Sequence, residues 1–245
     1  ILEPGAISTV EGYIAGHPEI SGIYADRNYY DVTMTHRLPQ PTKVAAMQSD
    51  RKLVGRAETI FELLGEHVGY LSGNVIKRAL WDQIVAEERD LSQFFNAWVH
   101  VYIMGRMMQR HPSWLYVAHP CVGWRSGNDS FLAEGMYKRL EIDVAGYDTI
   151  TAALFGRSTA VYRHTMARIL NHARFRIAHA KVHGAPGTFF TKARRLMTSY
   201  YRSNPSYWLT VYPLMLLPSA LLRTARLAKS VKDKAAERKC EGVTQ

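Results

Sequence analysis

The 245-residue chain contains only two cysteines, Cys121 and Cys240, and no apolar stretch long enough to cross a bilayer. Two cysteines cannot form the disulfide framework of a small secreted domain, and their positions do not match the paired spacing of a zinc cluster. The most apolar segment, residues 208–222, is about 15 residues long and is interrupted by Pro213 and Pro218. These features favour a protein of the reducing cytoplasm.

Acidic side chains are absent from residues 149–232. Residues 1–150 contain 14 basic and 18 acidic side chains, whereas residues 151–245 contain 17 and 3. The net charge of +10 therefore combines a slightly acidic first part with a strongly basic second part. We expect the basic segment to face an anionic partner, or at least to tolerate its own repulsion. With 47% hydrophobic residues, the chain has enough apolar side chains for a core, which excludes disorder throughout.

The spacing of apolar residues predicts an α/β arrangement first and helices alone after Phe131. A helix that is followed by a strand is the repeating unit of a mostly parallel sheet. The polar residues 28–52 predict a long loop, which in a compact domain tends to be functional. The expected elements are a helix up to Gly16, a strand over 20–26, a helix over 53–66, a strand over 68–76, a helix from 77, a helix over 91–108, a strand over 114–118, and helices over 136–154 and 158–182.

Two places carry side chains that are suited to catalysis or binding. His100 lies among aromatic residues on a predicted helix, where a histidine is usually a core residue but can also act as a base near neutral pH. Arg125, Asn128 and Asp129 lie on a loop after a predicted strand, and an arginine there can clamp a diphosphate. A turn that caps the helix beginning at residue 131 explains the same loop equally well.

The basic part has three interpretations. Aromatic residues within 200–222 are flanked by arginines, and we expect residues 194–229 to lie in the headgroup region of a membrane. The mixture of basic and aromatic residues also fits nucleic acid, although no recognised binding motif is present. The third interpretation is a basic helical subdomain that packs its apolar residues on itself or on a partner.

Three blocks, residues 69–82, 99–104 and 125–131, agree in order and spacing with a known family. Together they resemble the second half of bacterial family 2 glycosyltransferases, particularly the abequosyltransferase-like branch that builds O-antigen. Residues 1–7 resemble the helix that follows the aspartate-rich metal motif of that family. The resemblance covers residues 1 to about 155. The basic helical segment that follows lies outside it.

The resemblance implies an α/β fold: the C-terminal, acceptor-side part of a GT-A domain over residues 1–132, followed by a helical, basic region over 133–245. It implies an inverting hexosyltransferase that moves a sugar from a nucleotide-sugar donor to a lipid-linked saccharide acceptor in O-antigen and lipopolysaccharide synthesis. His100 lies on the helix where many members carry the catalytic base, which implies that it acts as the base or as an orienting residue. The substrate-binding residues that the resemblance implies are Asp26, Ser72, Asn74, Trp98, Arg125, Asn128 and Asp129.

The resemblance also implies a divalent cation, Mg²⁺ or Mn²⁺. We expect its aspartate ligands upstream of Ile1, so that the chain is a fragment that is inactive alone. Its expected partners include the polyprenyl-diphosphate acceptor and an anionic membrane surface, but not nucleic acid, and its expected location is peripheral, on the inner face of the bacterial cytoplasmic membrane. The alternative is a non-catalytic protein that binds nucleic acid or a membrane through its basic helical tail.

Overall fold

The computed structural model describes residues 1–39, 47–88, 90–94, 98–127, 135–222 and 224. The chain divides into two compact units, the first made of Ile1–Ala133 and Ala145–Ala167, the second of Glu134–Val144 and Arg168–Gln245. Helices α5 (Met136–Phe155) and α6 (Ala160–Val182) contribute residues to both units. The proposed domain boundary after residue 132 stays a prediction.

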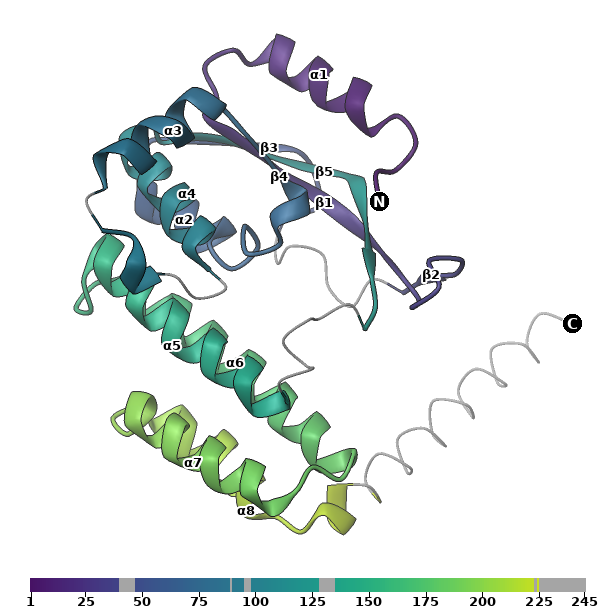
Figure 1. Ribbon diagram of the computed structural model, residues 1–245, viewed down its shortest axis with the longest axis vertical. Helices are drawn as coiled ribbons and strands as arrows, with labels where there is room; N and C mark the ends of the chain where they lie inside the picture. The colour runs from purple at the N-terminus through teal and green to yellow at the C-terminus, as the bar shows by residue number, and fades with distance from the viewer. Residues whose placement is uncertain (40–46, 89, 95–97, 128–134, 223, 225–245) are drawn as a thin grey trace, which may run out of the picture. The chain divides into compact units, whose positions relative to one another are not determined.

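A mixed five-stranded sheet organises the first unit (Figure 1). Its central strands, β1 (Gly22–Tyr30) and β5 (Ser113–Arg125), are parallel neighbours. On the far side of β5, β3 (Arg51–Val54) pairs antiparallel. Along the outer side of β1, β4 (Asn74–Ile76) pairs with its first half and β2 (Arg37–Leu38) with its last residues. The first unit is therefore a mixed α/β structure, as the sequence predicts, but the expectation of a mostly parallel sheet is wrong: only the β1–β5 pair is parallel, because β2, β3 and β4 pair with this central pair in the antiparallel direction.

Helices cover both faces of this sheet. Helix α1 (Ala6–Gly16) lies on one face, and the remaining helices of residues 1–110 lie on the other (Figure 1). Ile23 and Ala25 pack toward α1, and because strand side chains alternate, Tyr24 points to the opposite face. The helices of the opposite face are α2 (Ala57–Leu64), α3 (Arg78–Glu87) and α4 (Val99–Arg110).

Two expected elements have a different secondary structure over part of their length. The helix expected over 53–66 begins only at Ala57, because residues 51–54 pair with β5. The strand expected over 68–76 is mostly a turn and a 3-10 helix, Leu71–Gly73, before β4 begins. A Cβ on Gly73 would come within 3.0 Å of the Ala25 carbonyl oxygen, so glycine allows this turn to lie against β1.

Both predicted strands of the central pair are longer than expected. β1 continues to Tyr30 and β5 to Arg125, so residues at the start of both expected loops are part of the sheet. The helix expected from residue 91 begins at Val99, after a short 3-10 helix, Ser92–Phe94. The extra length of β1 and β5 carries the sheet beyond the part that α1 covers.

The pairing between β1 and β5 shifts in the middle of the sheet. It moves from Ala25 opposite Val117 to Arg27 opposite Val122, so β5 carries extra residues there. Pro120 lies in this bulge, where a residue without a backbone N–H is tolerated. The Ala118 amide donates to Oδ1 of Asp50 at 2.8 Å. On β1 the interruption falls at Asp26.

The described part of the second unit is helical. Besides its segments of α5 and α6, it contains α7 (Gly187–Tyr201), a π-helical turn (Tyr207–Val211) and α8 (Tyr212–Leu216). Lys181 is buried, and its Nζ donates to the carbonyls of Leu214 and Met215, which satisfies two groups at the end of α8. Among the described helices of the whole chain, none has the length and apolarity to span a bilayer.

Candidate functional site

Segment 66–74 connects several of the predicted site residues of the first unit. Asn74, at the start of β4, donates from Nδ2 to the carbonyls of Val68 and Tyr70, both at 2.9 Å. The Tyr147 hydroxyl donates to the carbonyl of Glu66 at 3.3 Å. These side chains accompany the backbone hydrogen bonds of the segment, such as those from the amides of Tyr70 and Gly73 to the carbonyls of His67 and Tyr70. The direct role of Asn74 in the structure is therefore to hold this segment in place.

His100 lies in the first turn of α4 and also contacts the segment. Its Nε2 is 3.2 Å from the carbonyl oxygen of Gly69. A carbonyl can only accept a hydrogen bond, so Nε2 carries the proton and the lone pair of a neutral ring lies on Nδ1. Burial lowers the pKa of His100, and the Gly69 carbonyl offsets only part of this effect. Near neutral pH the imidazole is thus uncharged and able to accept a proton.

Trp98 closes one side of the His100 ring. It precedes α4, is buried, and meets the imidazole edge-on with ring centroids 5.9 Å apart. Its indole also packs against Tyr147 at 5.6 Å, the residue that holds the Glu66 carbonyl. The position of His100 is therefore fixed by an aromatic contact on one side and a backbone hydrogen bond on the other.

Asp26 is buried at the register shift of β1. Its Oδ2 accepts a hydrogen bond from the Tyr116 hydroxyl at 3.3 Å, and its Oδ1 accepts one from the backbone amide of Arg27 at 2.9 Å. A buried carboxylate needs such donors, because the loss of water would otherwise cost several kcal/mol (about 3–5). Burial together with Asp26 raises the pKa of Tyr116, so this phenol stays protonated and remains a donor.

Next to Asp26, three tyrosines surround Arg27, and we call this group the tyrosine cage. Nη1 of Arg27 donates to the Tyr24 hydroxyl at 3.1 Å and Nε to the Tyr29 hydroxyl at 3.0 Å. Its guanidinium carbon lies 4.5 Å from the ring centre of Tyr70. The cage connects β1 to segment 66–74 through the stacking of the guanidinium on Tyr70. The sequence did not predict a role for these residues.

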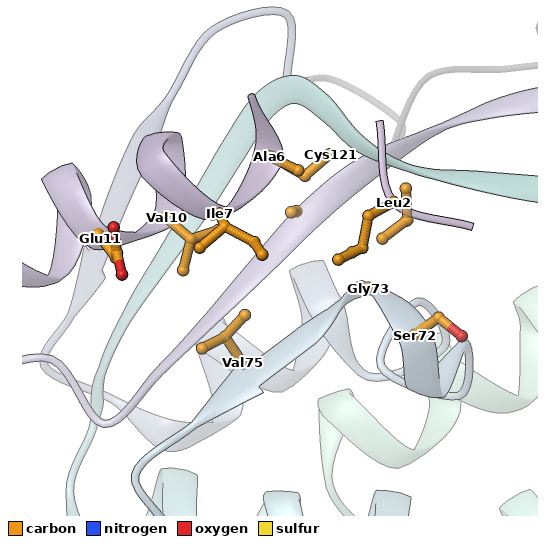
Figure 2. Close-up of a pocket in the computed structure, with 11 residues that line it drawn as sticks. Leu2, Ala6, Ile7, Val10, Glu11, Ser72, Gly73, Val75 and Cys121 are labelled. Carbon is orange, nitrogen blue, oxygen red and sulfur yellow. The ribbon is translucent and has the colours of Figure 1, made fainter. Parts of the chain in front are cut away.

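Ser72 lies at a pocket on the α1 face of the sheet (Figure 2). The pocket has a volume of about 170 Å³ and an almost entirely apolar lining. Ile7 and Val10 reach into it from α1 and Val75 from β4, as Figure 2 shows, while the Ser72 side chain lies at its edge. Ser72 is exposed, which leaves it accessible to a ligand, and its side chain is hydrogen-bonded to that of Tyr70.

The remaining predicted residues lie at and beyond the end of β5. Arg125 is its last residue, is exposed, and stands opposite Tyr30 of β1. Asn128 and Asp129 lie outside the described residues. The structure thus brings Asn74, Trp98 and His100 together at segment 66–74. It places Asp26 on β1 beside Tyr116, Ser72 at the pocket and Arg125 at the strand end. That these residues bind substrate stays a prediction.

A cation site is absent from the described part of the chain: no three His, Cys, Asp or Glu residues there are grouped in a way that could hold a metal ion. The buried carboxylate of Asp26 accepts hydrogen bonds from a phenol and a backbone amide instead. The described residues therefore do not fit the divalent cation that the family resemblance implies.

Comparison with known proteins finds one similar protein. No family model and no solved structure matches the chain. The chain is 29% identical over 101 residues to abequosyltransferase RfbV of Salmonella typhimurium, a match that covers 41% of this chain. The match spans only 29% of the length of RfbV. The similarity indicates a glycosyltransferase-like relationship.

Proposed function

We propose that this protein transfers a sugar from a nucleotide-sugar donor to a saccharide acceptor. The observation that carries the proposal is the 29% identity over 101 residues to RfbV, which is named for the transfer of a sugar, abequose. The mixed α/β first unit and the neutral, oriented imidazole of His100 support it. Sugar transfer by single displacement requires a base for the acceptor hydroxyl, and His100 has the properties of such a base.

In the proposed reaction the acceptor oxygen attacks the anomeric carbon as its proton passes to Nδ1 of His100. The new C–O bond forms while the bond between that carbon and the diphosphate breaks, and the nucleoside diphosphate leaves with the electron pair. Attack opposite the leaving group inverts the anomeric centre. The Gly69 carbonyl, which accepts from Nε2–H, stabilises the imidazolium that results. Segment 66–74 therefore orients the base.

The finer proposal follows the family resemblance. We propose an inverting, family 2, GT-A type hexosyltransferase whose acceptor is a lipid-linked saccharide of O-antigen synthesis, with Mg²⁺ or Mn²⁺ as its cation. Asp26, Trp98 and Arg125 are proposed substrate contacts. The proposed location is peripheral, on the inner face of the bacterial cytoplasmic membrane, where a lipid-linked acceptor is held.

The test is a transfer assay with the protein as its gene encodes it, including any residues before Ile1. Nucleotide sugars are offered one at a time with Mg²⁺ or Mn²⁺ and a polyprenyl-diphosphate saccharide, and labelled product is counted. His100→Ala should lower turnover by about 10²–10⁴-fold, because the acceptor proton loses its base, while nucleotide binding stays nearly unchanged.

The matched control is His164→Ala, since His164 is an exposed histidine of α6 that pairs with Glu62. This variant should keep its turnover. Transfer that survives His100→Ala would contradict the role of His100 alone. A protein that transfers no sugar from any donor would contradict the proposed function.

A further inference from the structure

A second pocket lies within the second unit, on α7 and the residues that follow it. It has a volume of about 510 Å³ and combines three arginines, Arg194, Arg195 and Arg202, with the aromatic rings of Trp208 and Tyr212. We call it the arginine groove. All three arginines are exposed, so their guanidinium groups are accessible from solvent. The candidate site of the first unit uses none of these residues.

Hydrogen bonds and ring contacts hold the aromatic wall of the groove. The Trp208 indole N–H donates to the carbonyl of Arg202 at 2.8 Å, which ties the ring to the end of α7. The rings of Trp208 and Tyr212 are 4.8 Å apart. Beside them, the hydroxyls of Thr198 and buried Tyr207 are hydrogen-bonded at 2.7 Å. The groove is therefore formed before any ligand arrives, which reduces the entropy cost of binding.

The positive charge of the groove is not offset by acidic residues that are close in the sequence. Residues 149–232 contain no Asp or Glu, so α7 and α8 bring no carboxylate to it. The carboxylates of α5 in the second unit pair with other cations, Lys138, Arg139 and Arg176. Arg194 and Arg195 are adjacent in sequence, and Arg202 follows about two helical turns later, directly after α7. Three guanidinium forks around one cavity match the oxygens of a phosphate group.

Large apolar side chains are exposed directly after the groove. Leu209 is 78% exposed, Leu216 is 56% exposed and Leu217 is 40% exposed. A nucleic acid that bound the arginines would leave these leucines in water, whereas a membrane would bury them beside its headgroups. Tryptophan and tyrosine, with an apolar ring and one polar atom, are suited to that boundary.

We propose that the arginine groove binds the phosphate of an anionic lipid headgroup at a membrane surface, with Leu209, Leu216 and Leu217 entering the adjacent apolar layer. The proposal does not depend on sugar transfer, because each residue in it belongs to the second unit. It assigns the basic part of the chain a defined phosphate site in addition to general attraction between opposite charges.

The test is co-sedimentation of the 245-residue chain with vesicles of phosphatidylcholine alone or with about 30 mol% phosphatidylglycerol. We expect binding to the anionic vesicles only. The variant R194Q/R195Q/R202Q should weaken it by about 10²-fold, since each of three basic side chains at an anionic surface contributes about fivefold. A control that removes equal charge elsewhere, R163Q/R174Q/K192Q, should weaken it by less than about threefold. Equal losses in the two variants, or equal binding to neutral vesicles, would overturn the phosphate site.

A second variant, R194K/R195K/R202K, keeps the charge but removes the planar forks. We expect it to lose about threefold or more in vesicle binding, and an unchanged affinity would contradict recognition through guanidinium.

The variant L209Q/L216Q should weaken binding to vesicles but not to soluble glycerol phosphate, which separates a membrane headgroup from free phosphate. Tighter binding to a single-stranded oligonucleotide than to anionic vesicles would reject the membrane as the partner. Circular dichroism of each variant checks that it is folded.

Discussion

At the scale of single residues, His100 is the group whose charge state matters most to the proposed reaction. Burial lowers its pKa, and the Gly69 carbonyl compensates only in part. The unfolded chain binds a proton near pH 6.5, but the folded protein does so only at a lower pH. Between the folded-state pKa of His100 and about pH 6.5, the unfolded chain binds a proton at this ring that the folded protein does not bind. The stability of the fold therefore depends on pH in this range.

We predict that the free energy of unfolding falls as the pH drops through about 6.5, and goes on falling until the folded-state pKa of His100 is passed. Well above pH 6.5 the imidazole is neutral in both the folded and the unfolded state, so His100 contributes no pH dependence of stability there. His100→Gln should remove this component of the slope. Urea unfolding at a series of pH values measures it.

Replacing the exposed His119 by Gln provides the control, since its side chain lies in the solvent-facing bulge of β5. A slope that is unchanged in His100→Gln, or lost equally in His119→Gln, would show that His100 titrates normally. An NMR titration of the imidazole protons gives the folded-state pKa directly.

The tyrosine cage shows what sequence spacing cannot reveal at this scale. Tyr24 and Arg27 are three residues apart on β1, and in a regular strand such residues point to opposite faces. The shift in pairing between Ala25 and Arg27 lies between them, and the Arg27 guanidinium reaches the Tyr24 hydroxyl. The shift depends on β5, which is about 90 residues away in sequence (Tyr116 to Asp26). No local pattern around Arg27 could therefore predict the cage.

At the scale of secondary-structure elements, the central strand pair depends on close packing at its first residues. Gly22 begins β1, and a Cβ there would lie 2.7 Å from the ring of Trp114, a fully buried residue of β5. The ring is enclosed by the core and cannot move away cheaply. Glycine at position 22 is thus required by packing against the indole.

We predict that Gly22→Ala lowers the free energy of unfolding by about 1–3 kcal/mol through this clash. Gly12→Ala is the matched substitution, because Gly12 lies in α1 and a Cβ there would meet no other segment within 4 Å. It should gain about 0.5–1 kcal/mol of stability from helix propensity. Urea midpoints at constant slope measure both changes. The two substitutions should therefore change the free energy of unfolding in opposite directions. A Gly22→Ala protein as stable as the parent would contradict the packing described for β1 and β5.

Some secondary-structure elements can be predicted from the local sequence, and others cannot. The long amphipathic helices were predicted nearly to their ends, because each is specified by its own apolar spacing. β3 was mistaken for the start of a helix, since four residues carry too little periodicity and its strand state comes from pairing with β5. Segment 68–76 was mistaken for a strand for a related reason: its turn is held by Asn74, His100 and Tyr147.

At the scale of the whole molecule, charge is distributed unequally along the chain. Acidic residues of the first unit form ion pairs such as Glu88 with Arg106 and Glu87 with Arg110. Residues 149–232 have no acidic side chain with which to do the same. Like charges that are held close in a folded structure repel one another, and dissolved salt screens that repulsion.

We predict that adding sodium chloride, from about 20 mM to about 300 mM, stabilises the protein by about 1 kcal/mol, because the Debye length shortens from about 20 Å to about 6 Å. Urea unfolding at each salt concentration measures the change. The gain should be smaller in R194Q/R195Q/R202Q, where three of the repelling charges are gone. Stability that falls with salt would mean that the ion pairs of the first unit outweigh the repulsion.

Local sequence was enough to specify the class of structure and the charge pattern: an α/β part, a helical basic part, and a histidine on a helix among aromatic residues. These properties follow from composition and from the short periods of helices and strands, which depend only on neighbouring residues. Only the packed chain establishes which carbonyl orients His100, how Asp26 is buried, which tyrosines bind Arg27, and that three arginines and two aromatic rings form one groove. Each of these depends on contacts between segments distant in sequence, and such contacts are fixed only when the whole chain packs.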